Sequence, residues 1–204
     1  MITAGPTWVP IDAVRVISNS ATGRTGILLA EDLAKKGARV TLILGPVENC
    51  CIDKRIKVIR FSFFKELNRL LKNELKKKRY DIVLHSAAVS DYRPAQERKN
   101  KLNSHNKKLT LILKQTPKMI DYLRKESPCS FLIGFKFEPQ ASKRSLIKQA
   151  RLLMRRAHLD LVVANSLVKN NYVAYLVKAK NKYGPFLKKE RLSRGLIGLI
   201  EKII

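Results

Sequence analysis

The segment from Met1 to Leu44 most constrains the fold, because its residue pattern changes twice in a fixed order. Met1 to Ala4 has the character of a short strand end, and a loop rich in Gly, Pro, Ser and Asn follows. From Arg24 to Lys36 small and apolar residues recur with a helical period, at Gly26, Ala30, Leu33 and Gly37. Ala38 to Leu44 is an apolar run closed by Gly45-Pro46, which predicts a second strand. This order is typical of a βαβ unit, so we expect a parallel strand pair with a right-handed crossover.

The same alternation continues along the rest of the chain. Strand-like runs cover 56–61, 80–89, 131–137 and 159–164, and helical stripes cover 64–79 and 146–157. The pattern predicts a doubly wound α/β fold with a mostly parallel, Rossmann-like sheet. No linker or repeat interrupts it, so we interpret residues 1–204 as one domain.

Two segments break this rhythm by alternating apolar and polar residues, Lys108–Lys114 and Tyr172–Lys178. We expect them to form additional antiparallel strands, paired on one side of the sheet. The stretch from Arg93 to Asn106 is polar, basic and nearly free of apolar residues, which is typical of a surface loop.

The chain carries 42 Lys and Arg against 16 Asp and Glu, a net charge of +26. Such a balance favours polyanionic partners, namely nucleic acid, anionic membrane or phosphorylated small molecules. Because the basic residues are spread along the whole chain, we favour solvated, Lys-rich faces over a dedicated nucleic-acid surface. No apolar run reaches the ~20 residues that cross a bilayer, and Met1 does not begin a secretion signal, so we expect a cytoplasmic protein without a membrane partner.

The cysteines and histidines do not form a recognisable metal or redox pattern. Cys50, Cys51 and Cys129 are odd in number and lack C-x-x-C spacing, which indicates reduced thiols. The three histidines have no ligand-like spacing and are interpreted as structural or surface residues; they are His85, His105 and His158.

The loop from Ile17 to Gly26 opens the first predicted helix. Gly23 and Gly26 allow close backbone approach, and the free N–H groups of a helix start favour an anion. The loop has Gly-x-x-Gly and lacks both Gly-x-Gly-x-x-Gly and the P-loop Gly-Lys-Ser/Thr. A phosphate site and a simple tight turn therefore stay equally open on this pattern.

Two further segments carry candidate polar groups. Asp91 follows a buried strand, where it is placed to accept from a ribose hydroxyl or to hold a metal; the alternative is a turn cap by Ser90 or Asp91. A basic loop contains lysines that suit a triphosphate-neutralising lid, although a solvated charge run is the simpler interpretation; they are Lys99, Lys101, Lys107 and Lys108.

In sequence order, these pieces resemble the phosphopantothenate–cysteine ligases. The resemblance rests on I-T-A-G-P-T and P-I-D-x-V-R-x-I-S-N up to Asn19, followed by the Gly-x-x-Gly helix start. It continues with A-A-V-S-D-Y, Lys101-Leu102, T-P-K-M-I, G-F-K and V-A-N, and it covers nearly the whole chain. It implies a ligase of coenzyme A synthesis that uses CTP or ATP, with Mg²⁺, to activate 4′-phosphopantothenate as an acyl-nucleotidylate. The amine of L-cysteine then attacks this mixed anhydride.

The resemblance also implies roles for individual residues. Asn19 matches the asparagine that binds the acyl intermediate, and Lys101 matches the loop lysine that serves activation; both are catalytic candidates. Arg15, Gly23 and Gly26, together with Asn19, are the substrate-binding candidates. The nucleotide-binding candidates surround base and ribose; they are Ala87, Asp91, Lys101, Pro117, Lys118, Met119, Ile120 and Phe135. The metal ligands are left unassigned, and the family implies a homodimer.

The chain departs from the family pattern in ways that bear on the nucleotide. Leu153 and Ala157 occupy helix positions where many bacterial members carry nucleotide-contacting lysines, for which Arg155 and Arg156 are the available substitutes. CTP and ATP therefore both stay open. Other departures are Trp8-Val9, Ser20-Ala21-Thr22 and Asn165-Ser166. The flavin-dependent decarboxylase half of many bacterial members does not occur in these residues, so we expect a stand-alone ligase or a chain cut at its second domain.

Two alternatives belong to other classes. A short-chain reductase is disfavoured, because the sequence has no Tyr-x-x-x-Lys dyad and no complete glycine fingerprint. A nucleic-acid-binding protein would need one concentrated basic face and strongly salt-dependent binding.

Overall fold

The computed structural model describes residues 1–48, 51–103 and 107–203. Cys50 and His105 lie outside the described residues, as do the other residues of 104–106 within the predicted loop. The cysteines at 51 and 129 are both exposed and not disulfide-bonded.

An eight-stranded sheet forms the centre of the molecule, in the order β12-β11-β10-β9-β6-β1-β4-β5. Its strands are β1 (Ile2–Ala4), β4 (Thr41–Leu44), β5 (Lys57–Arg60), β6 (Ile82–His85), β9 (Phe131–Phe137), β10 (Leu161–Val168), β11 (Asn171–Val177) and β12 (Lys182–Phe186). All neighbouring pairs are parallel except β10–β11 and β11–β12. The predicted mostly parallel sheet with added antiparallel strands is confirmed.

Strand β1 is the point where the winding of the sheet reverses. Ile2 pairs with Leu42 of β4 on one side and with Leu84 of β6 on the other. The chain therefore winds outward from β1 to β5, then returns and winds the opposite way from β6. In open α/β sheets ligands bind at the carboxyl ends of the strands beside such a reversal.

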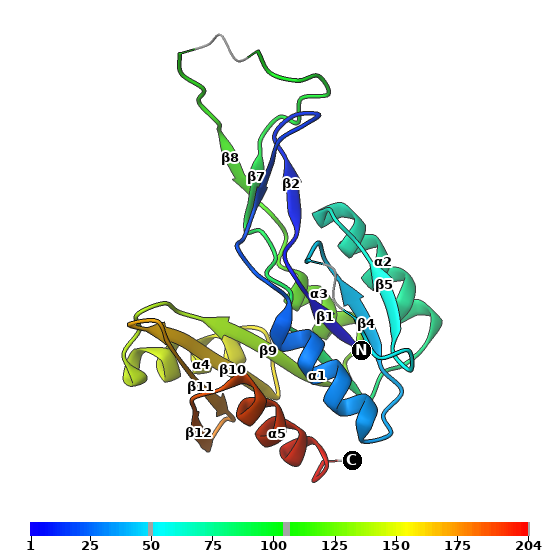
Figure 1. Cartoon of the computed structure of the whole chain (residues 1–204), viewed down its shortest axis with the longest axis vertical. Helices are drawn as coiled ribbons and strands as arrows, with labels where there is room; N and C mark the ends of the chain where they lie inside the picture. The colour runs from blue at the N-terminus through cyan, green and yellow to red at the C-terminus, as the bar shows by residue number, and fades with distance from the viewer. Residues whose placement is uncertain (49–50, 104–106, 204) are drawn as a thin grey trace.

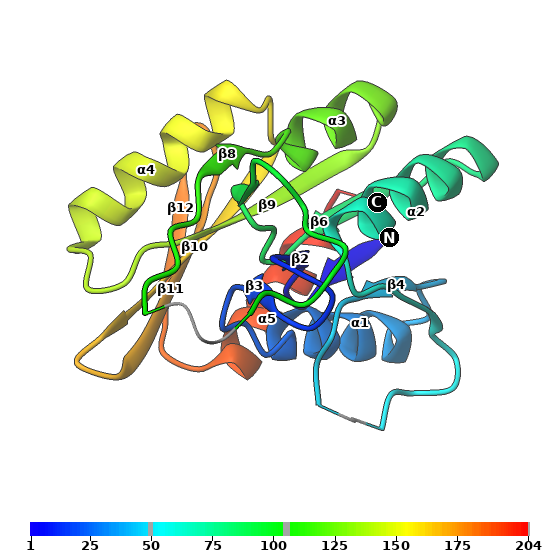
Figure 2. The ribbon, with the colours of Figure 1, turned by 90° about the horizontal axis from the view of Figure 1, so that it is seen from above.

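Helices cover both faces of the sheet, as Figures 1 and 2 show. They are α1 (Arg24–Lys35), α2 (Phe64–Lys77), α3 (Met119–Glu126), α4 (Lys143–Arg156) and α5 (Lys189–Ile200). Leu71 of α2, Leu123 of α3 and Leu146 of α4 are buried in the core on one face. Leu29 of α1 and Leu192 of α5 are buried in the core on the other. The central strands are thus shielded from water on both faces, which explains the nearly continuous apolar runs of β4 and β6.

The predicted end of the first helix is confirmed at Gly37. Its backbone has φ of +86°, a left-handed conformation that glycine adopts at little steric cost. The N–H of Gly37 donates to Ala34, and that of Ala38 donates to Leu33. These two bonds satisfy carbonyls that the last helical turn leaves free.

Four short strands form an arm that projects beyond the carboxyl ends of β1 and β6 (Figure 1). Two antiparallel pairs build it: β2 (Trp8–Pro10) with β3 (Val16–Ser18), and β7 (Tyr92–Pro94) with β8 (Leu113–Gln115). The predicted pairing of the two irregular segments on one side of the sheet is wrong, because β8 belongs to the arm whereas β11 extends the main sheet. Alternation indicates a strand but does not specify its partner.

Candidate active site

Two cavities open at the carboxyl ends of β1, β6, β9 and β10, at the reversal of the sheet, and both are lined by Ala87 and Phe135. The first, of about 410 Å³, is called the glycine-loop cavity. It is lined by Gly5, residues 20–26, residues 86–88, Phe135, Phe137, Asn165, Leu167, Tyr172 and Lys189. The second, of about 230 Å³, is called the Asp91 cavity. It is lined by His85, Ala87, Val89, Asp91, residues 117–120, residues 134–136, Leu153 and Arg156.

The glycine loop places the start of α1 at its cavity. Gly23 has φ of +68°, and no side chain caps the helix that begins at Arg24. A Cβ on Gly26 would lie 2.5 Å from the Cβ of Ala4 and 2.6 Å from the Oγ of Ser86, so only glycine permits this approach of helix to strand. The loop is therefore both a tight turn and an open helix N-terminus, whose free N–H groups favour an anion.

The far wall of the glycine-loop cavity carries polar groups without protein partners. The Asn165 Oδ1 and the Tyr172 hydroxyl are buried and have no hydrogen-bond partner within residues 1–48, 51–103 and 107–203. Burial raises the pKa of Tyr172, so its hydroxyl stays protonated. The Lys189 Nζ lies 6.0 Å from the centre of the Tyr172 ring. An anionic ligand that also carries a hydrogen-bond donor would satisfy both groups, because the Tyr172 hydroxyl can donate to an anionic oxygen whereas the Asn165 Oδ1 only accepts, and unpaired buried polar atoms are costly.

Lys189 and Arg24 give the cavity its positive charge. Burial, and next the charge of Arg24, lower the pKa of Lys189. The lining residues of this cavity include no Asp or Glu. Tyr172 and Lys189 were not among the predicted site residues, because only the tertiary fold brings the start of β11 and of α5 to the glycine loop.

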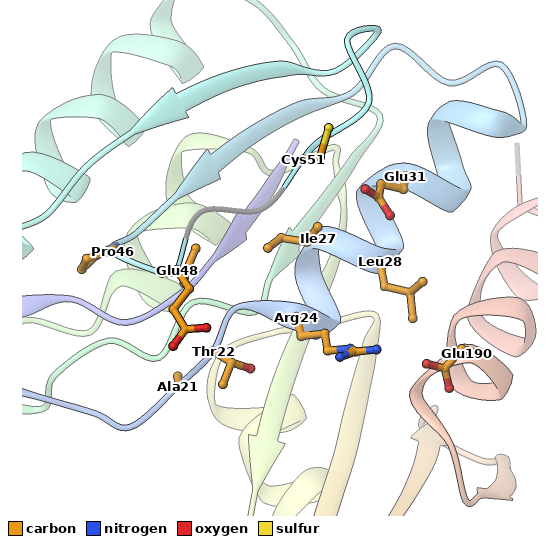
Figure 3. Close-up of a pocket in the computed structure, with 11 residues that line it drawn as sticks. Ala21, Thr22, Arg24, Ile27, Leu28, Glu31, Pro46, Glu48, Cys51 and Glu190 are labelled. Carbon is orange, nitrogen blue, oxygen red and sulfur yellow. The ribbon is translucent and has the colours of Figure 1, made fainter.

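A neighbouring pocket of about 690 Å³ lies on the other side of the glycine loop, between α1, α5 and the loop after β4 (Figure 3). It shares Ala21, Thr22 and Arg24 with the glycine-loop cavity. Three carboxylates line it, those of Glu31, Glu48 and Glu190, as Figure 3 shows. These charges disfavour phosphate there, so the glycine-loop cavity is the better anion site.

The Asp91 cavity gathers seven of the eight predicted nucleotide-binding residues, from three separate segments of the chain; they are Ala87, Asp91, Pro117, Lys118, Met119, Ile120 and Phe135. The Asp91 Oδ1 accepts a hydrogen bond of 2.6 Å from the Lys118 Nζ. Arg156 lines this cavity, whereas Arg155 lines a different pocket beside α4. Of the two arginines considered as lysine substitutes, only Arg156 is in place.

Threonines of separate motifs hold this part of the site together. The Thr7 Oγ1 accepts from the Ser90 N–H at 2.9 Å, and the Thr116 Oγ1 donates to the Ser90 carbonyl at 2.6 Å. The Thr116 N–H donates to the Asp91 carbonyl at 2.9 Å. Ser90 is buried, and the segment around it is braced from both sides. The I-T-A-G-P-T, A-A-V-S-D-Y and T-P-K-M-I motifs are therefore parts of one hydrogen-bonded unit.

Asn19 lies against the backbone that borders both cavities. Its Nδ2 donates to the carbonyls of Ala88 at 3.0 Å and Val89 at 3.3 Å. Because both contacts use the amide nitrogen, a hydrogen bond from Asn19 to a substrate carbonyl requires that one of them be released.

Arg15 and Lys101 lie outside the two cavities. Arg15 follows the turn between β2 and β3 in the arm, where its Nη1 lies 3.3 Å from the Asp12 Oδ2. Lys101 is exposed, next to the buried Leu102. The structure thus separates these two predicted residues from the sites that gather the others.

His85 is a buried histidine at the end of β6. Its Nδ1 lies 2.8 Å from the Thr3 Oγ1, and the Ala87 N–H donates to that same oxygen at 3.3 Å. Burial lowers the pKa of His85 from 6.5 to about 4, so the ring is neutral near neutral pH. His85 is therefore a structural residue that also borders the Asp91 cavity.

Acid should destabilise the fold through His85. Its folded pKa lies below its unfolded value, so the unfolded chain takes up a proton first as pH falls. We expect about 3 kcal/mol of stability to be lost between pH 6.5 and 4. Urea unfolding at several pH values measures this loss, and His85→Gln should have the shallower profile. Equal pH slopes for both proteins would contradict the assignment.

Among the described residues, none of the helices combines the length and the apolar character needed to cross a bilayer. Within the same residues, no group of three or more His, Cys, Asp or Glu side chains is placed to hold a metal ion.

Comparison with known proteins places the chain in a family. The model of the DNA/pantothenate metabolism flavoprotein C-terminal domain matches residues 1–203. The coenzyme A biosynthesis bifunctional protein CoaBC of Thermococcus kodakarensis is 36% identical over 209 residues, which cover 100% of this chain and 51% of that protein. The chain thus spans about half the length of the curated relatives it matches first.

Solved structures agree with this match. The crystal structure of the DNA/pantothenate metabolism flavoprotein from Streptococcus pneumoniae has a TM-score of 0.88 at 25% identity, and covers 100% of this chain and 98% of its own. A variant of Cab2 in complex with phosphopantothenate-cysteine shares the fold, with a TM-score of 0.78 at 20% identity over 98% of this chain and 85% of its own. The chain therefore belongs to the family of the DNA/pantothenate metabolism flavoprotein C-terminal domain.

Proposed function

We propose that this chain is a phosphopantothenate–cysteine ligase domain, which joins 4′-phosphopantothenate to L-cysteine through an acyl-nucleotidylate. The observation that carries the proposal is the 36% identity, over the whole chain, to a bifunctional protein of coenzyme A biosynthesis. The Cab2 variant, which shares the fold, is described with phosphopantothenate-cysteine bound. We also propose that residues 1–204 form one such domain and that it works in the cytoplasm.

In this proposal each cavity receives one reactant. The nucleoside of CTP or ATP occupies the Asp91 cavity, where Met119, Ile120 and Phe135 supply apolar walls and Asp91 accepts from the ribose. The glycine-loop cavity receives the other reactant, 4′-phosphopantothenate, whose phosphate oxygens the start of α1 and Lys189 stabilise. The two ligands meet at Ala87 and Phe135, which line both cavities.

The chemistry proceeds in two displacements. A carboxylate oxygen of phosphopantothenate attacks the α-phosphorus, and pyrophosphate leaves. The cysteine amine then attacks the acyl carbon, and the nucleoside monophosphate leaves. Asn19 orients the acyl oxygen and Lys101 neutralises charge on the triphosphate, while Arg15 binds the phosphate or carboxylate of the substrate. Mg²⁺ enters with the triphosphate, since it commonly takes few protein ligands.

We further propose that the protein is a homodimer that associates through the arm. The arm carries apolar side chains that are exposed to solvent in a single chain; Val14 is 66% exposed and Tyr92 is 54% exposed. Exposed apolar side chains that gather on one projecting element are typical of an association surface.

The decisive experiment uses purified protein with Mg²⁺ and either CTP or ATP. Pyrophosphate release should require phosphopantothenate but not cysteine, and phosphopantothenoylcysteine should form only when cysteine is added. The ratio of product formed with the two nucleotides gives the preference. Folded protein that makes no product with either nucleotide would overturn the proposal.

A further inference from the structure

Asp12 is a buried carboxylate in the turn between β2 and β3, where its side chain is 0% exposed. Its Oδ1 accepts from the backbone N–H groups of Val14 and Arg15, both at 2.8 Å. Its Oδ2 accepts from the N–H of Leu102 at 3.0 Å and lies 3.3 Å from the Arg15 Nη1. The two oxygens thus have different tasks: Oδ1 shapes the turn, and Oδ2 reaches a segment 90 residues away in sequence.

The segment that Asp12 reaches is the one that carries Lys101. Leu102 is clamped at both backbone groups, because its carbonyl also accepts from the Arg15 Nη2 at 3.5 Å. Its side chain is buried. On the other side of Lys101, the N–H of Arg98 donates to the Ile11 carbonyl at 3.4 Å. The exposed Lys101 therefore lies between two points at which its segment is tied to the same turn.

We propose that Asp12 is a positioning residue, whose carboxylate holds Leu102 and thereby presents the adjacent Lys101 to the activation step. The proposal rests on the proposed ligase function of Lys101. A carboxylate suits the task, because it accepts with both oxygens and its charge strengthens each bond. An asparagine has one acceptor oxygen, so either the turn or Leu102 would face an N–H₂ group. The Leu102 N–H and next the Val14 N–H lower the pKa of Asp12 to about 2, which keeps it ionised at working pH.

Asp12→Asn should slow phosphopantothenate-dependent pyrophosphate release, measured without cysteine, by about 10- to 100-fold, since a displaced catalytic group loses rate steeply. The matched control is Asp53→Asn. Asp53 also accepts from a backbone N–H, that of Arg55 at 2.9 Å, and pairs with the guanidinium of Arg55, but it lies in the loop before β5. The control variant should keep nearly the wild-type rate. Asp12→Glu, which keeps the charge but moves the oxygens, should lose an intermediate amount.

A double-mutant cycle separates positioning from general damage. If Asp12 acts through Lys101, Asp12→Asn should slow a Lys101→Gln enzyme by less than about twofold. The same loss in both backgrounds would overturn the proposal. Hydrogen exchange at the Leu102 amide provides a readout that does not need activity, and it should be faster in Asp12→Asn than in wild type or Asp53→Asn. Unchanged exchange at the Leu102 amide would also refute the proposal that Asp12 holds Leu102 in place. A wild-type protein with no nucleotide-dependent activity would instead refute the ligase function, while the exchange result still decides whether Asp12 holds the segment.

Discussion

Replacement of Asn19 by aspartate is expected to lower the rate of phosphopantothenoylcysteine formation by roughly 100- to 1,000-fold, the size of effect seen when an oxyanion donor is lost. Asn19 donates to the carbonyls of Ala88 and Val89, on the backbone that borders both cavities. A carboxylate at this position has no hydrogen to donate, so it would repel those carbonyls as well as the acyl oxygen of the substrate. The rate at which phosphopantothenoylcysteine forms in the presence of cysteine measures the loss.

Asn73→Asp is the control for this substitution. Asn73 is exposed on α2, so the change adds the same charge far from the cavities. That variant should retain the wild-type rate. If Asn19→Asp turned over as fast as Asn73→Asp, Asn19 would have no part in the mechanism.

Lys101→Gln is expected to have the second large effect, a loss of about 100-fold in the activation step, because a fixed positive charge stabilises the charge that develops on the phosphates. Lys101 is exposed in the structure, so the substitution removes charge without leaving a cavity in the core. Single-turnover experiments separate the two half-reactions. Formation of the intermediate should be slow, whereas attack by cysteine on intermediate already formed should proceed at a normal rate.

Lys99→Gln tests whether position or mere charge matters. It removes the same charge two residues earlier in the same exposed segment. A much smaller loss than for Lys101→Gln is expected. Equal losses from the two variants would mean that the loop acts only as a diffuse positive field, whose effect added salt would screen.

The sequence predicts the parts of the fold in which burial imposes a period. Helix α1, with Leu29 and Leu33 turned into the core, and the strands on either side of it follow directly from spacing. Helix α5 does not follow from spacing in this way. It contains Gly195 and Gly198, and glycine is the poorest helix former other than proline. Gly195 has a packing reason, because a Cβ there would lie 2.6 Å from the Phe186 ring. A close contact of this kind is invisible before the chain is folded.

The sequence predicts which residues gather at the candidate site where short motifs meet, but it does not predict single residues that arrive there from distant elements. The apolar run predicted to be a strand up to Val89 ends as strand at His85, and the remainder becomes the wall of the cavities. Tyr172 and Lys189 reach the glycine loop only because β11 and α5 close over it. Arg15 and Lys101 belong to the arm, so motif order alone does not tell which cavity, or which copy of the chain, they serve.

The shared position of Ala87 has a consequence for anyone who would redesign this protein. A larger side chain there would intrude on both cavities at once. If each cavity binds one reactant as proposed, affinity for one reactant cannot be changed at this residue without a penalty to the other. Leu153 and Arg156 line only the Asp91 cavity, and Leu167 and Tyr172 line only the glycine-loop cavity. Substitutions that change one cavity independently of the other should therefore be made at these outer walls. Ala87, where the two cavities meet, should be kept.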